Sequence, residues 1–164
     1  VPEVPAALAP ATLGDAAPYL AVDDCDWPLS GNAFRFADYL PGERIDHVDG
    51  MTVEEAEHQT ATRLYQNSAK VHFNQHTEGQ GRFGRRLIYG GHVISLARAL
   101  SFNGLANAFH VSAINGGRHV APLFSGETVY AWSEVIDYAE LSGRDDVRPL
   151  RCRPMPPPAP PPSP

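Results

Sequence analysis

Residues 89–104, YGGHVISLARALSFNG, decide the fold of this chain. Apolar side chains occupy nearly the whole circumference of a helix over residues 92–103, and such a helix has to be buried. Gly90 and Gly91 precede it, and Gly104 follows where a left-handed C-cap residue belongs. The sequence therefore predicts a buried helix with glycine at both ends.

Upstream of this segment, the sequence predicts one strand and one helix. Residues 43–48 form a strand candidate that ends at the turn dipeptide Asp-Gly at 49–50. Thr52 and Glu55 fit a capping box, and apolar residues then recur at helical spacing. We predict a helix over residues 53–65 with Thr52 as its N-cap.

Downstream of the buried helix, two stretches have strand patterns. Residues 108–114 alternate, with Phe109, Val111 and Ala113 on one face. Residues 128–137, TVYAWSEVID, are rich in β-branched and aromatic side chains with period-two polarity. A helix that is apolar on every side needs cover on every side, so an α+β architecture with an antiparallel sheet curled around it is expected.

Composition limits the partners. The 164 residues suffice for one domain, and the formal charge of -6 disfavours nucleic acid, whose phosphates a protein has to neutralise. No apolar run approaches the roughly 20 residues of a membrane helix. Cys25 and Cys152 form no zinc motif or disulfide framework, which predicts a cytoplasmic protein.

The two ends differ in composition from the middle. Residues 1–34 are rich in Pro, Ala and small side chains, which is typical of a linker. Residues 148–164 hold nine of the 16 prolines and predict a disordered, polyproline-like tail. A frameshift in GC-rich DNA would produce such an abrupt change. A single folded domain is therefore expected over residues 35–147.

Three blocks of the chain carry the candidate chemistry. They are YQNSAKVHFNQH at 65–76, FGRRLIYGGHVISLA at 83–97 and RHVAPLFSGETVYAWSEVID at 118–137. In this order they resemble the MaoC-like hydratases. Asn67 and His72 stand where the family motif G-D-x-N-P-L-H has its Asp and its His, so an amide replaces the acid.

Further motifs of the family have counterparts in this chain. An aromatic residue and glycine before the central helix correspond to Tyr89, Gly90 and Gly91. The family block P-x-x-x-G-[DE]-T matches Pro122, Gly126, Glu127 and Thr128. The resemblance covers residues 35–147, and the stretch GERIDHVDGMTVEEAEH is similar to the second half of the two-domain mesaconyl-CoA hydratases.

The resemblance implies a hot-dog fold, a sheet wrapped around a central helix, here with its last strands missing. It implies a hydro-lyase that adds water to, or removes it from, a branched enoyl-CoA thioester such as mesaconyl-CoA or β-methylmalyl-CoA. No cofactor is expected, and the partner is a second copy or a second hot-dog half. A non-catalytic remnant, a partner-binding module and an acyl-CoA thioesterase remain alternatives.

The chemistry of hydration assigns roles to the matched residues. His72 is the expected acid/base, because an imidazole can accept and return a proton near neutral pH. Backbone N–H groups of Gly90 and Gly91, with Tyr89 beside them, would hold the enolate oxygen. Asn67 can orient a water or the imidazole but cannot take a proton. Glu78 is the nearest downstream carboxylate.

The arginines Arg82, Arg85 and Arg86 form a basic cluster that either holds the phosphates of CoA or lies on a solvated loop. Two further alternatives stay open: Gly90 and Gly91 as a hinge, and His72 with His76 as a metal pair. A zinc site needs a third ligand, so no metal is expected. The remaining histidines are expected to be structural: His47, His58, His92, His110 and His119.

Overall fold

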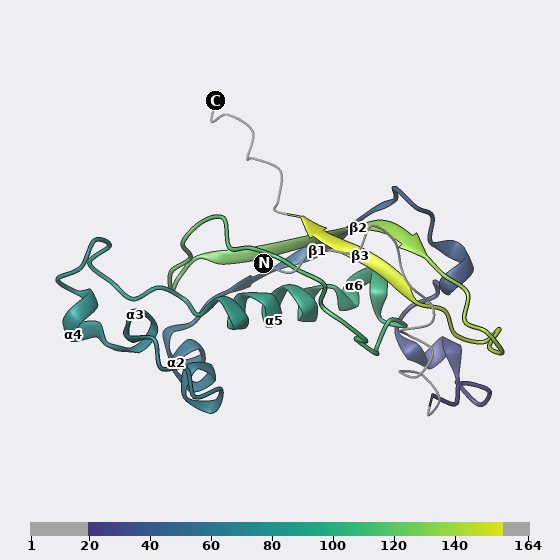
Figure 1. The fold of residues 1–164 in the computed structure, drawn as a ribbon, viewed down its shortest axis with the longest axis horizontal. Helices are drawn as coiled ribbons and strands as arrows, with labels where there is room; N and C mark the ends of the chain where they lie inside the picture. The colour runs from purple at the N-terminus through teal and green to yellow at the C-terminus, as the bar shows by residue number, and fades with distance from the viewer. Residues whose placement is uncertain (1–19, 156–164) are drawn as a thin grey trace. The chain divides into compact units, whose positions relative to one another are not determined.

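The computed structural model describes residues 20–155 (Figure 1). Its elements are the 3-10 helices η2 (Trp27–Ser30) and η3 (Phe36–Asp38), the helices α2 (Glu55–Leu64), α3 (Lys70–Phe73), α4 (Gln75–Glu78), α5 (Gly90–Leu100) and α6 (Phe102–Leu105), and the strands β1 (Arg44–Thr52), β2 (Thr128–Tyr138) and β3 (Leu150–Met155). None of the helices in this range has the length and apolar character that crossing a membrane requires.

The chain divides into two compact units, which are described separately. Of the described residues, unit 1 contains 20–48, 101–117 and 131–155, and unit 2 contains Asp49–Leu100 and Arg118–Tyr130. The predicted division into a linker, a domain at 35–147 and a tail stays a prediction, and its residues 1–19 and 156–164 lie outside the described range.

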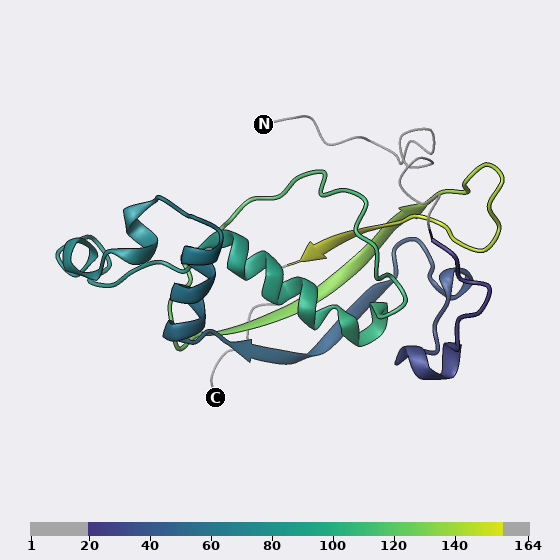
Figure 2. The ribbon, with the colours of Figure 1, turned by 90° about the horizontal axis from the view of Figure 1, so that it is seen from below.

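The strands of the described chain form a three-stranded sheet in the order β1-β2-β3. Figure 2 shows β2 in green between β1 in blue and β3 in yellow. β2 and β3 pair antiparallel, with Val135 opposite Cys152 and a register irregularity before Asp137. The predicted strand at 128–137 is therefore confirmed.

β3 occupies a stretch for which the sequence predicted irregular polyproline structure, so that prediction is wrong for residues 150–155. Pro154 pairs with Ser133 within the strand. The lost N–H is tolerated because β3 lies at an edge of the sheet, where only one side of the strand bonds to a neighbour. The carboxylate of Asp137 on β2 also accepts two hydrogen bonds from the guanidinium of Arg151 on β3.

β1 extends beyond its predicted end. The dipeptide at 49–50 lies inside the strand, so the expected turn is wrong. A Cβ on Gly50 would lie 2.6 Å from the ring of Tyr130, which means that glycine serves close packing here. Thr52 ends β1 and its hydroxyl lies 2.9 Å from that of Thr128, so it does not cap α2. Glu54 precedes α2 without a side-chain cap.

α5 and α6 replace the single helix expected over residues 92–103. Gly104 has φ of +97°, as predicted for a left-handed glycine, and the helical dihedrals break there. In α5 only His92 and Leu100 are buried, while Ile94 is 49% exposed. Burial on every side is therefore wrong.

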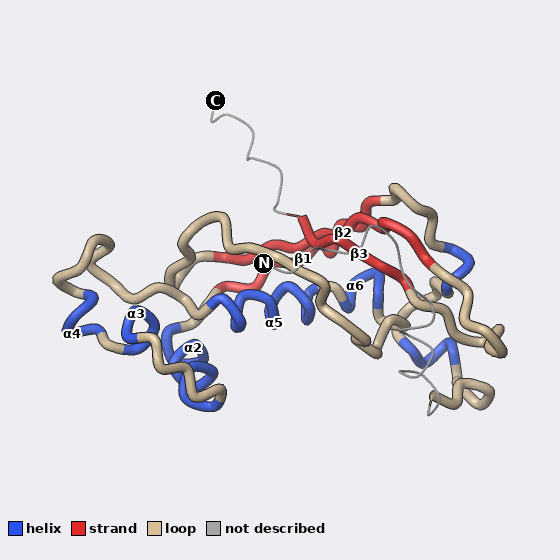
Figure 3. Tube along the Cα trace, in the orientation of Figure 1, coloured by secondary structure: helices blue, strands red, loops and turns tan. Residues whose placement is uncertain are grey.

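Residues 108–114 form part of a loop, drawn tan in Figure 3, and the strand expected there is wrong. Phe109 and Val111, assigned to its inner face, are both more than half exposed. Alternation alone cannot make a strand without a neighbour to bond. Unit 1 instead packs around Tyr39, Leu105 and Val135.

Candidate active site

His72 lies on α3 in unit 2, and its imidazole has a defined orientation. Nδ1 lies 3.0 Å from the backbone oxygen of Leu87. A carbonyl can only accept, so Nδ1 carries the proton and a neutral His72 has its lone pair on Nε2. Among the described residues, no side chain or backbone group bonds to Nε2. His72 therefore presents a free acceptor, as an acid/base residue requires.

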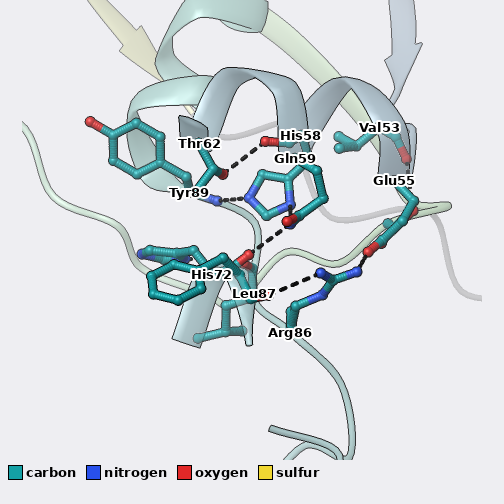
Figure 4. Close-up of polar contacts among 11 residues, drawn as sticks. Val53, Glu55, His58, Gln59, Thr62, His72, Arg86, Leu87 and Tyr89 are labelled. Atoms are coloured by element: carbon teal, nitrogen blue, oxygen red, sulfur yellow. Dashed lines mark hydrogen bonds and ion pairs between the residues drawn. The ribbon is translucent and has the colours of Figure 1, made fainter. Parts of the chain in front are cut away.

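Two side chains hold the carbonyl end of α3, as Figure 4 shows. Gln59 donates from Nε2 to the backbone oxygen of His72 at 2.9 Å, and Arg86 donates to that of Phe73 at 3.2 Å. Arg86 also forms an ion pair with Glu55. A four-residue helix leaves its last carbonyls without helical partners, so these bonds fix the backbone that carries His72.

The segment before α5 is anchored at three consecutive amides. Leu87 donates to the backbone oxygen of Val71 at 3.0 Å, and Ile88 donates to that of Leu123 at 2.9 Å. The third amide, that of Tyr89, donates to Nε2 of His58 at 2.8 Å. The Tyr89 ring lies 5.6 Å from the His72 ring between centroids. The structure therefore brings His72 and Tyr89 together.

Gly90 and Gly91 form the first two positions of α5. Within the described chain their N–H groups have no partner, as expected for the first turn of a helix. A Cβ on Gly90 would lie 2.2 Å from Nε2 of His119, and one on Gly91 would lie 2.6 Å from the Tyr89 ring. Glycine is required at both positions because the rings of His119 and Tyr89 leave no room for a side chain. A ligand that reached Gly90 would also contact the exposed imidazole of His119.

His58 is only 1% exposed, and sequence reasoning assigned it no role beyond structure. Burial, followed by the nearby His92 and His72, lowers the pKa of His58 from 6.5 to about 4. His92 is also buried, and its Nε2 lies 2.9 Å from a carboxylate oxygen of Glu57. The sequence feature that could have drawn attention to His58 is the stretch GERIDHVDGMTVEEAEH, which ends at this residue.

Asn67 and Glu78 are not bonded to His72. The side-chain oxygen of Asn67 accepts the amide of Ala69 at 2.9 Å and so shapes the loop before α3. Asn67 also borders a hollow of about 270 Å³ whose lining omits His72: Gln59, Thr62, Arg63, Gln66, Asn67 and Phe73. Glu78 ends α4, and no hydrogen bond or ion pair in the described chain joins it to His72.

The basic cluster separates into different environments. Arg86 is engaged inside unit 2, as described above. Arg82 lies over the ring of Phe83, and Arg85 lies 3.8 Å from the ring centre of Phe124, with Glu127 at 3.7 Å. Arg82 and Arg85 are exposed, which leaves their guanidinium groups accessible to an anion.

His72 and His76 lie on separate short helices, α3 and α4. Within residues 20–155, no three His, Cys, Asp or Glu side chains come together as a group that could hold a metal ion. Glu127 of the P-x-x-x-G-[DE]-T block closes a turn, because its carboxylate accepts the amide of Phe124 at 2.9 Å. The carboxylate of Glu127 therefore stabilises this turn.

Comparison with known proteins identifies relatives of the chain. It is 61% identical over 124 residues to a β-methylmalyl-CoA dehydratase of Chloroflexus aurantiacus and 60% identical over 123 residues to a mesaconyl-CoA hydratase of Cereibacter sphaeroides. These matches cover 76% and 75% of this chain but 35% of each relative, so the chain spans about a third of their length. No family model matches the chain.

Two solved structures place the fold. A MaoC domain dehydratase from Chloroflexus aurantiacus matches with a TM-score of 0.79 and 56% identity, over 82% of this chain and 38% of that chain. A MaoC-like dehydratase from Rhodospirillum rubrum matches with a TM-score of 0.58 and 18% identity, over 74% of this chain and 83% of that chain, and supports the fold alone. The chain is therefore a homologue, over about a third of their length, of a β-methylmalyl-CoA dehydratase and a mesaconyl-CoA hydratase, and it has the hot-dog, MaoC-like fold of the α+β class.

Proposed function

We propose that this chain takes part in the reversible addition of water to a branched enoyl-CoA thioester, with mesaconyl-CoA and β-methylmalyl-CoA as the pair. The names of its two relatives support the reaction class. The observation that carries the proposal is the His72 imidazole, which has Nδ1 fixed by Leu87, Nε2 free and its ring beside the residue that leads into Gly90.

In the proposed mechanism, His72 acts alone as base and acid. Nε2 removes a proton from water as the water oxygen bonds to the β-carbon, and the electron pair of the double bond moves to the thioester as an enolate. The amides of Gly90 and Gly91 stabilise the enolate oxygen, helped by the positive end of α5. His72 then returns its proton to the α-carbon, which balances the addition.

We assign both proton transfers to His72 because the residue that stands at the acid position of the family motif cannot take a proton. Asn67 is an amide whose oxygen is used by Ala69, so we assign it a role in shaping the loop and orienting water. We propose that the exposed Arg82 and Arg85 bind the phosphates of CoA. Arg86 instead stabilises the end of α3 through its hydrogen bond to Phe73 and its ion pair with Glu55. A second copy or second hot-dog half would complete the enzyme, in the cytoplasm.

The test follows the loss of the absorbance of the conjugated thioester after mesaconyl-CoA is mixed with the chain. We expect His72→Ala to reduce the rate about 10²–10⁴-fold, the range for loss of a general acid–base residue. His76→Ala is the matched control, because His76 is an exposed histidine four residues away. A folded wild-type chain that adds no water, or a His72→Ala variant as active as wild type, would contradict the proposal.

The same samples test the alternatives. Release of free CoA thiol without hydration would indicate thioester hydrolysis. Absence of both reactions from a folded chain would favour a non-catalytic module, the reading that the replacement of an acid by Asn67 supports.

A further inference from the structure

We propose that His58 is a positioning residue, which holds the backbone of Tyr89 so that the amides of Gly90 and Gly91 meet the enolate oxygen. This inference rests on the proposed function and adds to it a residue that never touches the substrate. Its basis is the hydrogen bond between the buried His58 imidazole and the Tyr89 amide, shown in Figure 4.

The backbone on both sides of the glycine pair is restrained through Tyr89. Its amide donates to Nε2 of His58 at 2.8 Å, and its carbonyl accepts the amides of His92 at 2.9 Å and Val93 at 3.3 Å. Gly90 and Gly91 follow directly and lack side chains that could anchor them. Their free N–H groups therefore depend for their direction on the restraints at Tyr89.

His58 differs from the other acceptors in this segment. Leu87 and Ile88 donate to backbone carbonyls of Val71 and Leu123, whereas Tyr89 donates to a side chain that comes from α2. A backbone N–H can only donate, so Nε2 must be unprotonated, and a neutral His58 carries its proton on Nδ1. If Nε2 of His58 were protonated, its N–H would face the N–H of Tyr89, and the hydrogen bond between them would be lost.

The surroundings of His58 favour the neutral ring. Its centroid lies 6.2 Å from that of His92 and 6.4 Å from that of His72, and both rings disfavour a further positive charge. Glu57 acts in the opposite direction, but it is bonded to His92. Burial outweighs the carboxylate, and the pKa of His58 is held at about 4. The acceptor is thus available at every pH near neutrality.

Geometry makes such a restraint matter for rate. Stabilisation of an oxyanion requires donors close to the place where the charge develops, and small displacements reduce the rate strongly. Loss of the His58 acceptor leaves the Tyr89 amide unpaired and free to turn. The expected consequence is a lower kcat with KM nearly unchanged, because the amides act on the enolate and not on the bound substrate.

The experiment compares three variants of the full chain. His58→Leu removes the acceptor, His58→Gln keeps an acceptor oxygen at the place of Nε2, and Thr62→Val removes a buried hydroxyl that bonds to the backbone oxygen of His58 one turn away. We expect kcat to fall about 10²-fold in His58→Leu, to recover to within about tenfold of wild type in His58→Gln, and to stay unchanged in Thr62→Val. Equal losses in all three variants would show a general effect of destabilisation and would overturn the inference.

A second readout does not need activity. Amide ¹H–¹⁵N spectra should show shifted Gly90 and Gly91 signals in His58→Leu, restored positions in His58→Gln, and the Nδ1–H tautomer of His58 in the wild type. If wild type adds no water while these shifts appear, the proposed function fails and the positioning by His58 stands. Unmoved Gly90 and Gly91 signals, or a His58 protonated at Nε2, would overturn the positioning itself.

Discussion

The two units of this chain use buried histidines differently. In unit 1, Nδ1 of His47 lies 2.7 Å from the carbonyl of Asn103 and Nε2 lies 2.9 Å from the hydroxyl of Ser133, so both ring nitrogens are occupied by neighbours within the fold. In unit 2, Nε2 of the buried His58 accepts one backbone amide and its Nδ1 lies 3.5 Å from Nε2 of Gln59, whereas the half-buried His72 keeps one nitrogen free.

Exposure does not separate these residues, because His47 and His58 are each 1% exposed. What separates them is the partner. His47 joins segments of the scaffold, and Asn103 returns a bond to its carbonyl at 3.0 Å. His58 holds the peptide that leads into two free amides. Substitution of His47 should therefore alter stability, whereas substitutions beside the free amides should alter the reaction. Four experiments test how the two units differ.

The largest effect is expected from Gly90→Ala. A methyl group would collide with Nε2 of His119, next to the amide assigned to the enolate oxygen. We expect hydration to slow about 10²–10³-fold, as for loss of one oxyanion donor. Gly117→Ala is the control, because a Cβ at Gly117 meets nothing within 4 Å. If adding His119→Ala restored the rate, the loss would come from the displaced imidazole and not from blocked access to the amide.

His47→Leu should lower the free energy of unfolding by about 2–4 kcal/mol, because it removes the two hydrogen bonds that join the buried imidazole to the carbonyl of Asn103 and the hydroxyl of Ser133. Urea denaturation measures this loss. His110→Leu changes an exposed histidine of the same unit and should have little effect. The contrast between the units would fail if His47→Leu left stability intact but reduced kcat.

Acid should destabilise the wild type through His58. The pKa of His58 is 6.5 when unfolded and about 4 when folded, so between these values only the unfolded chain binds the proton. Stability therefore falls as the pH falls through this window. Between about pH 7 and about pH 5 the wild type should lose about 2 kcal/mol more than His58→Gln. Equal losses in urea titrations would contradict the low pKa of His58.

A further prediction concerns β3 of unit 1. Burial raises the pKa of Cys152 to about 11, whereas Cys25 is exposed. Alkylation of the native chain should therefore modify Cys25 about 100-fold faster, since the thiolate is the reactive form. Peptide mass spectrometry measures both rates. Equal rates would indicate that Cys152 is not held in a paired strand.

Elements whose pattern is local could be predicted from the sequence. The helix at 53–65 and the strand at 128–137 match α2 and β2 closely, because periodicity within a short segment reports which face is buried. The strand predicted at 108–114 does not form, because alternation within a segment does not show whether a neighbouring strand is there to pair with it. β3 could not be predicted from composition, because a high proline content argues against a strand in general. An edge strand nevertheless tolerates proline, since one side of it makes no ladder hydrogen bonds.

The candidate site divides in the same way. Family motifs indicated His72, Tyr89 and the two glycines, and the structure brings His72 beside Tyr89. His58 was missed because its partner is a backbone amide 31 residues away, and a backbone amide leaves no mark in the sequence. The bond from Nδ1 of His72 to Leu87, which decides the tautomer, likewise joins residues 15 apart.

The sequence by itself determined the main helices, the central strand and the order of motifs, since each depends on side chains within a few residues of one another. Only the tertiary structure decided which nitrogen of His72 is free, which arginine is engaged and which glycine is crowded. Those properties arise from hydrogen bonds and contacts between segments far apart in the chain, and these form only when folding brings the segments together.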